Sequence, residues 1–186
     1  MTLISSALSS GRSAHDSFFK KLTGLVEKCS AGLVARIVFL SVLFFYFIKS
    51  ALTKIDGFWP NASAYAQILP HRAAEYEYVI SRFEPYHHFI VYLGTYGEFI
   101  LPVLVVIGLF GRVASLGMII FIAVQSVVDI WGHFVDGGLP FDKVTTGIIA
   151  DQRLMWVFIL MVIVVRGSGA LSVDRWLGER SHKTPV

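Results

Sequence analysis

The sequence predicts an all-α integral membrane protein: a four-helix bundle with an N-terminal amphipathic helix and a helical outer loop. Hydrophobic residues make up 55% of the 186 residues and charged residues only 16%, whereas a soluble domain carries about 25% charged residues. The apolar residues gather in four runs, each long enough to cross a hydrocarbon core about 30 Å thick. With four spans, the basic residues that flank these runs all fall on the same side of the membrane, and an odd number of spans would break this agreement.

The four spans form one domain, residues 31–177, between an N-terminal segment, 1–30, and a tail, 178–186. Every backbone polar group in a bilayer must be bonded within its own helix, so each apolar run is expected to be helical throughout. A turn as short as Phe110-Gly111-Arg112 makes the second and third spans an antiparallel hairpin. The predicted spans are residues 31–54, 86–110, 112–133 and 148–166.

Lysine and arginine residues predict the orientation of the spans. They lie near the N-terminus, in the 110–112 turn and near the C-terminus, while the loops on the opposite side are richer in Asp and Glu. The positive-inside rule therefore places both termini in the cytoplasm. The basic residues form no dense patch of the kind that follows a phosphate backbone, so the lipid bilayer is the expected partner and nucleic acid is not.

The segment before the first span is expected to form an amphipathic helix. Over residues 15–29, apolar side chains recur at helical spacing with lysines elsewhere, which is typical of a helix on the cytoplasmic membrane surface. A plain juxtamembrane linker is the alternative.

The only cysteine, Cys29, excludes an internal disulfide, an iron–sulfur cluster and a thiolate zinc site.

Short helices are also predicted outside the spans. In the long outer loop, Asn61 is expected to cap a helix that Pro70 ends, and a second helix follows up to Arg82. After the fourth span, Ser172 is expected to cap a short helix that continues through Trp176. The outer loop is rich in Tyr, which suggests that it packs over the bundle or lies at the interface.

Glu98 is the clearest polar candidate within a span. It follows His87 by about 16 Å of helix, which places it near the middle of the membrane. A charge there costs about 2.5 to 3.5 kcal/mol, so an intramembrane carboxylate needs a reason. Lys49 and Arg153 are possible partners. Glu98 is either a proton-accepting or quinone-contacting group, or an interhelical clamp to Lys49 or a hydroxyl.

A polar stripe on the third span predicts a pocket. Gln125, Asp129 and His133 recur every four residues on one helix face, and His87 and Glu98 share a face of the second span. Because these helices are consecutive and antiparallel, the two faces can enclose a pocket that opens outward. The alternative is that these groups simply lie at the wet interface. The histidines are not spaced to converge on one ion, so no metal or haem site is expected.

Three strings resemble the DoxX family of small bacterial and archaeal membrane proteins: ARIVFLSVLFFYFIKSALTKIDGF, YGEFILPVLVVIGLFGRVASLGMIIFIAVQ and RGSGALSVDRWL. The resemblance covers about residues 31–177. Ala51 departs from it where a Gly is common, and Ser168 replaces the usual Pro. The residues that match the family pattern are Arg36, Lys54, Glu98, Pro102, Gly108, Leu109, Phe110, Arg112, Gly167, Gly169, Leu171, Ser172 and Asp174.

The resemblance implies a four-helix bundle in a cytoplasmic (inner) membrane and a link to redox chemistry. Relatives include a subunit of an archaeal thiosulfate:quinone oxidoreductase and a mycobacterial protein that associates with superoxide dismutase and a sulfurtransferase. We therefore expect a subunit or partner of a membrane redox complex, or a homo-oligomer, with a quinone or sulfur-compound site. If enzymatic, it is a component of a quinone-linked oxidoreductase.

The sequence contains no cofactor motif, although a quinone fits the expected site. A small-solute or proton transporter, and a scaffold that recruits soluble redox enzymes, are the alternatives. The residues predicted to form the pocket are Glu98, Lys54, Lys49, Gln125, Asp129, His133 and His87.

Overall fold

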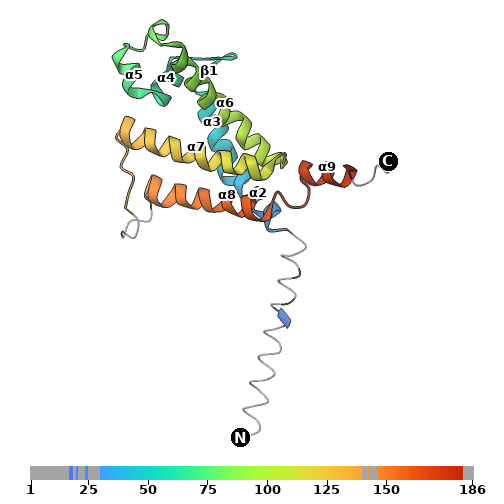
Figure 1. Cartoon of the computed structure of the whole chain (residues 1–186). Helices are drawn as coiled ribbons and strands as arrows, with labels where there is room; N and C mark the ends of the chain where they lie inside the picture. The colour runs from blue at the N-terminus through green and yellow to red at the C-terminus, as the bar shows by residue number, and fades with distance from the viewer. Residues whose placement is uncertain are drawn as a thin grey trace.

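The computed structural model is an all-α bundle, which confirms the predicted fold class (Figure 1). It describes residues 30–139 and 146–181, together with residues 17, 18, 20, 24 and 142. The amphipathic helix predicted over residues 15–29 lies outside the described residues apart from the first four of these single positions. In the described part of the chain, four helices are long and apolar enough to cross a membrane: Ala31–Leu52, Pro85–Ile107, Gly111–Gly132 and Ile148–Arg166.

The first and fourth membrane helices are not α-helical throughout. The first consists of α2 (Ala31–Phe39), the π-helical segment η1 (Leu40–Phe44) and α3 (Phe45–Leu52). The fourth begins with a second π-helical segment, η3 (Ile148–Arg153), and continues as α8 (Leu154–Arg166). A π-helical turn holds an extra residue, so the side chains after it point in directions that a regular α-helix would not give.

The second and third membrane helices, α6 (Pro85–Ile107) and α7 (Gly111–Gly132), form the predicted hairpin. Their connection begins earlier than the predicted turn at residues 110–112. Gly108 takes a left-handed conformation, with φ at 67°, and its amide donates to Leu104 O. This arrangement ends α6 because glycine adopts a positive φ without steric cost.

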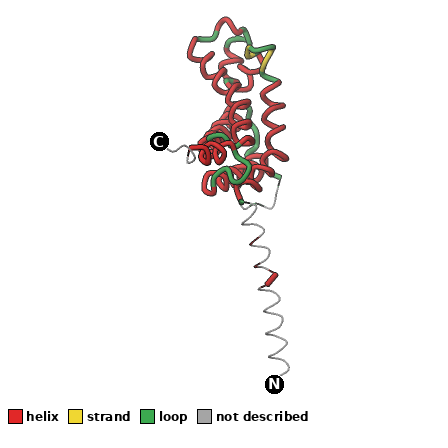
Figure 2. Tube along the Cα trace, turned by 90° about the vertical axis from the view of Figure 1, so that its right-hand side faces the viewer, coloured by secondary structure: helices red, strands yellow, loops and turns green. Residues whose placement is uncertain are grey.

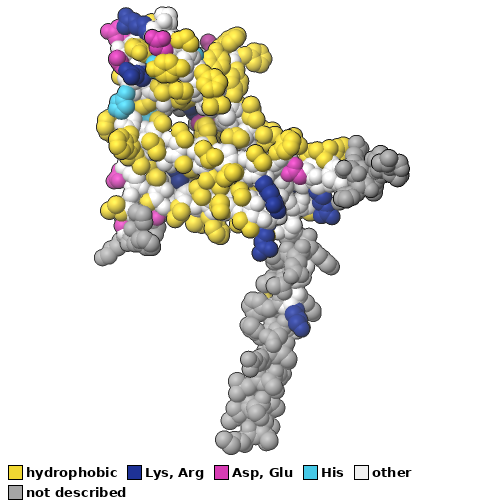
Figure 3. All heavy atoms as spheres, in the orientation of Figure 1, with side chains coloured by type: hydrophobic (Ala, Val, Ile, Leu, Met, Phe, Trp, Pro, Cys, Tyr) yellow, Lys and Arg dark blue, Asp and Glu magenta, His cyan; other side chains and the backbone are white. Residues whose placement is uncertain are grey.

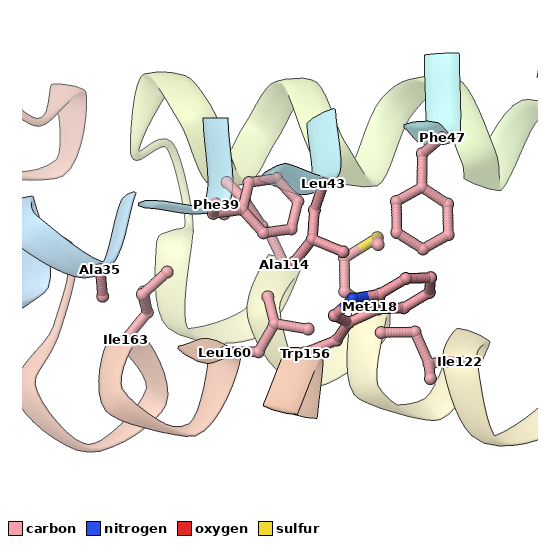
Figure 4. Packing of buried hydrophobic residues seen from close by; sticks show 11 residues of the cluster. Ala35, Phe39, Leu43, Phe47, Ala114, Met118, Ile122, Trp156, Leu160 and Ile163 are labelled. Atoms are coloured by element: carbon pink, nitrogen blue, oxygen red, sulfur yellow. The ribbon is translucent and has the colours of Figure 1, made fainter. Parts of the chain in front are cut away.

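The four membrane helices close into a ring. The first packs against α6 and α8, and α7 lies between α6 and α8. Their common core is wholly apolar and includes Phe39, Leu43, Met118 and Leu160 (Figure 4). Such side chains pack at the density of an organic crystal and fix the distances between the helices.

The loop between the first and second membrane helices folds into a compact unit, residues 55–84, which we call the cap. It consists of the hairpin strands β1 (Ile55–Asp56) and β2 (Trp59–Pro60), then α4 (Ala62–Ile68), α5 (Pro70–Glu75) and the short 3-10 helix η2 (Ile80–Arg82). Asn61 caps α4 by accepting from the Ala64 amide at 3.1 Å, as predicted. Figure 2 shows the cap at one end of the bundle.

The chain ends in α9 (Val173–Ser181), at the opposite end of the bundle from the cap (Figure 1). Ser172 caps this helix, as predicted, because its Oγ accepts from the Arg175 amide at 3.3 Å. The helix runs beyond Trp176, where the sequence prediction ended it.

Candidate functional site: a polar cavity beneath the cap

A cavity of about 410 Å³ lies where the four membrane helices meet the cap. Figure 3 shows a hollow beneath the cap in which basic and acidic side chains are visible among hydrophobic ones. A volume of this size lies within the range of small-molecule sites. The charged and polar side chains that line it include Lys54, Glu98, Gln125, Asp129, His133 and Arg153.

Lys54 and Glu98 form a buried ion pair in this cavity. Lys54 Nζ lies 2.7 Å from Glu98 Oε2, and each side chain is only 4% exposed. Ser50 joins the pair: its Oγ accepts from Lys54 Nζ at 2.8 Å, and it donates to Glu98 Oε1 at 3.5 Å. The carboxylate of α6 and the amine that follows α3 therefore neutralise one another within a hydrogen-bonded group.

Arg153 and Asp129 form a second ion pair on the other side of the cavity. Arg153 also donates from Nη1 to Ser126 Oγ at 2.9 Å. Ser126 in turn donates to the carbonyl of Ile122, one turn earlier on α7, at 2.7 Å. The arginine is the last residue of η3, so the π-helical start of the fourth membrane helix positions it against α7.

Two polar atoms of the lining lack a partner in the part of the chain that the structure describes. They are the buried Gln125 Oε1, an acceptor, and the buried Arg153 Nε, a donor. Buried polar atoms are nearly always hydrogen-bonded, because leaving one unpaired costs about 1 to 3 kcal/mol. The lining thus includes two ion pairs, and two of its side chains each carry one buried polar atom without a partner among the described residues.

Five of the seven predicted pocket residues line this cavity: Lys54, Glu98, Gln125, Asp129 and His133. Lys49 does not, because its side chain is exposed on the outside of the bundle. The partner of Glu98 is therefore Lys54 with the Ser50 hydroxyl, rather than Lys49 or Arg153.

His87 also lies away from the cavity, although it is buried on the same helix as Glu98. Its Nδ1 accepts from the Glu84 amide at 3.2 Å, and its ring packs against Tyr76 and Phe83. It completes a capping box at the start of α6 and has a structural role there.

Sequence reasoning did not assign Ser50, Gln67 or Ser126 to the site. Ser50 lies four residues before Lys54, one helical turn away, which is a weak signal in such an apolar helix. Ser126 follows Gln125 directly, and its role depends on the arginine of another helix.

Among the described residues, no group of three His, Cys, Asp or Glu side chains could hold a metal ion.

The cap closes one side of the cavity through two histidine contacts with α7. His133 Nε2, at the end of α7, lies 3.0 Å from Gln67 O in α4, and His71 Nε2 in α5 lies 2.9 Å from Trp131 O. In both cases the ring N–H donates, because a carbonyl oxygen can only accept. The cap is thus attached to the helix that carries the polar stripe.

Within the cap, Tyr65 anchors α4 to the start of α6. Its hydroxyl contacts His88 Nδ1, and its ring packs against Phe83. Burial raises the pKa of the Tyr65 phenol above its ordinary value, which keeps it neutral and able to hydrogen-bond. Further along α4, Ile68 lies so close to Gly94 of α6 that a Cβ there would approach Ile68 Cδ1 to 2.9 Å.

The remaining motif residues gather at the end of the bundle opposite the cap, and we call this group the inner clamp because it lies farthest from the cap. Arg36 lies buried between the end of α6 and the loop that follows α8. Its guanidinium donates to Val105 O at 3.2 Å and Ser168 O at 3.0 Å, and also to Val106 O. It thus binds carbonyls in the last turn of α6, where intrahelical partners run out, and in the loop that follows α8.

Asp174 supplies the other half of the inner clamp. Its carboxylate accepts from the amides of Phe110 and Gly111 at 2.7 and 2.9 Å, and from Ser168 Oγ at 2.8 Å. A carboxylate at a helix N-terminus is favoured by the helix dipole. These contacts attach α9 to the start of α7. The other motif residues near the inner clamp are Gly108, Arg112, Gly167, Gly169 and Ser172, while Pro102 is buried within α6.

Comparison with known proteins places these features in a family. No curated protein and no solved structure matches the chain. The DoxX family model matches residues 31–129, more than half of the 186 residues. The matched segment includes Arg36 of the inner clamp and the Lys54–Glu98 pair of the cavity. The chain is therefore a multi-pass membrane protein that belongs to the DoxX family.

Proposed function

We propose that the cavity binds the head of a quinone or quinol, and that the protein is a subunit or partner of a redox complex in a bacterial cytoplasmic membrane. The unpaired Gln125 Oε1 and Arg153 Nε carry this proposal. A ligand hydroxyl can donate to Gln125 Oε1, which a carbonyl oxygen cannot do, and either group can accept from Arg153 Nε. This pairing favours the hydroxyl form of the ligand.

The charge of the lining favours a neutral ligand over a sulfur oxyanion. Lys54 and Arg153 are each already paired with a carboxylate. An anion such as thiosulfate would lose its hydration without finding an unneutralised cation, which is costly in a buried site. Of the two ligand classes expected from the sequence, the quinone class is the better match.

Replacing Gln125 with Leu tests this site. We expect Gln125→Leu to weaken binding of a tailless benzoquinol by about ten-fold, the effect of losing one hydrogen bond to a buried acceptor. Thr95→Val is the matched control, because Thr95 Oγ1 is also buried without a partner but does not line the cavity. Affinities are measured by titration of the purified protein in lipid nanodiscs.

Equal affinities for the wild type, Gln125→Leu and Thr95→Val would refute the proposed site. Competition by thiosulfate at concentrations similar to those of the quinol would favour the sulfur-compound reading instead. Native co-purification in mild detergent, with mass spectrometry of bound lipid-soluble molecules, would identify the redox subunits or show a homo-oligomer.

We further propose that both termini face the cytoplasm and that the cap faces the opposite side of the membrane. Basic residues that precede the first membrane helix in the sequence, that lie at the α6–α7 turn and that follow the fourth membrane helix support this orientation, since an even number of spans puts these three parts of the sequence on one side. The cavity would then lie in the outer half of the bilayer, beneath the cap.

A further inference from the structure

An apolar groove of about 280 Å³ runs between the cap and α7, next to the polar cavity. Its walls come from the junction of α4 and α5 on one side and from the outer end of α7 on the other. Gly132 allows this close approach, since a Cβ there would lie against Pro70 of the cap. The apolar side chains that line it include Ile68, Pro70, Val127, Val128 and Trp131.

The groove lies next to the cavity and shares two lining residues with it. Ile68 of the cap and Val128 of α7 line both of them. The two neighbours of Val128 on α7 line different hollows: Asp129 lines the cavity, and Val127 lines the groove. Figures 1 and 3 share one orientation, and the hollow of Figure 3 lies on the side of the bundle between the cap and α7.

The lateral position of this opening matters because the side of a membrane bundle faces lipid rather than water. Val127 is 58% exposed and Trp131 is 75% exposed on this side. A tryptophan near the end of a membrane helix is typical of the interface between lipid and water. From Trp131 to Val127 the groove therefore extends from the interface toward the hydrocarbon region.

We propose that this groove holds the hydrocarbon tail of the molecule whose head binds in the cavity. The ligand is then a membrane-borne amphiphile, such as a quinol with an isoprenoid tail, that enters sideways from the bilayer between the cap and α7. The inference rests on the proposed function, and it deepens it by committing to a tailed ligand rather than a small solute. A polar cavity beside an apolar groove matches both parts of such a molecule.

Filling the groove tests the proposal without touching the cavity. Val127→Trp places a bulky side chain in the groove, and Ile120→Trp is the matched control. Ile120 lies two turns away on the same face of α7, is also 58% exposed, and lines neither the cavity nor the groove. Binding of a benzoquinol with a decyl tail and of the same head without a tail is measured at equilibrium in nanodiscs.

We expect Val127→Trp to weaken binding of the tailed quinol by about ten-fold or more, because a groove that is overfilled excludes the tail. Binding of the tailless head should stay within about two-fold of the wild type, and Ile120→Trp should change neither. Melting temperatures of both variants show whether the fold is intact, and tailless binding to each variant reports an intact cavity.

The outcomes separate this inference from the proposed function. If Val127→Trp weakens both ligands equally, or if both tryptophan variants have the same effect on the tailed one, the tail does not lie in the groove and the inference fails. If the tailless head binds the wild type but Val127→Trp does not weaken binding of the tailed quinol, the head still binds in the cavity and the inference about the tail is refuted. If neither ligand binds the wild type, the proposed function itself fails.

Discussion

At the residue scale, the Lys54–Glu98 pair joins α6 to the residues that follow α3 in the half of the bundle next to the cap. Both side chains are almost fully buried, and Ser50 is the only further hydrogen-bonding side chain that joins them among the described residues. Burying two charges is costly, and the pair repays this cost only while both partners are present. Removing one partner leaves the other as an uncompensated charge.

We predict that Glu98→Gln or Lys54→Met alone lowers the free energy of unfolding by about 3 to 5 kcal/mol, the usual cost of breaking a buried pair. The double variant should lose much less than the sum of the two single losses, because it leaves no buried charge. Unfolding in detergent, arranged as a double-mutant cycle, measures this coupling.

The Arg72–Glu75 pair is the control for this cycle, since both of its side chains are more than half exposed. Glu75→Gln should change the free energy of unfolding by less than about 1 kcal/mol. Additive losses at Lys54 and Glu98 would show that the two groups do not act as a pair.

At this scale the sequence located the intramembrane carboxylate but not its partner. Lys49 and Lys54 are five residues apart and so lie on different faces of a regular helix. The π-helical segment at Leu40–Phe44 shifts those faces, and Lys54 lies beyond the helix end at Leu52. Helical periodicity therefore cannot say which lysine turns inward, whereas the family resemblance pointed to Lys54.

At the scale of elements, the inner clamp holds the ends of three segments together. Arg36 of α2 contacts carbonyls at the end of α6 and in the loop before α9. A guanidinium can serve several carbonyls at once because its five N–H groups spread in a plane. A lysine has one nitrogen and cannot reach the same set.

Arg36→Lys should therefore loosen the loop before α9 while the charge is retained. We predict faster cleavage within residues 167–175 by a protease added to detergent-solubilised protein, with a loss of stability of about 2 kcal/mol. Quinol binding at the distant cavity should be unchanged. Cleavage at the wild-type rate would show that the loop does not depend on the guanidinium.

Element boundaries were predicted to within a few residues, and the misses have local causes. The sequence placed the turn of the α6–α7 hairpin at residues 110–112, where the charge of Arg112 interrupts the apolar run. The helix in fact ends at Ile107, because Gly108 adopts a left-handed conformation and Asp174 binds the amides at the start of α7. That carboxylate comes from the far end of the chain, so no local pattern reveals it.

For the whole molecule, hydropathy alone predicted the number of spans, because a bilayer admits only long apolar helices. It did not predict how the cap sits on the bundle. That arrangement depends on contacts such as His133 with Gln67 O, between residues far apart in the sequence. Gln125, Asp129 and His133 line the cavity because helical periodicity held on α7, whereas His87 packs within the cap core instead.

The proposed orientation of the whole molecule can be tested with single cysteines. In intact cells, we predict that a membrane-impermeant maleimide labels Ser63→Cys of the cap, in a Cys29→Ser background. In the wild-type protein, the same reagent should label Cys29 only after the cells are permeabilised. The opposite labelling pattern would invert the orientation and place the cavity in the cytoplasmic half of the bilayer.

The two ion pairs of the cavity also decide how the site responds to the electrical potential across the membrane. A charge that moves through this potential gains or loses about 2.3 kcal/mol per 100 mV. Lys54 is balanced by Glu98 and Arg153 by Asp129, so the lining carries no net charge from these pairs. A neutral amphiphile that arrives from the lipid therefore transfers no charge when it binds. Occupancy of the cavity should be electrically silent, and it should be the same in an energised cell as in a de-energised one.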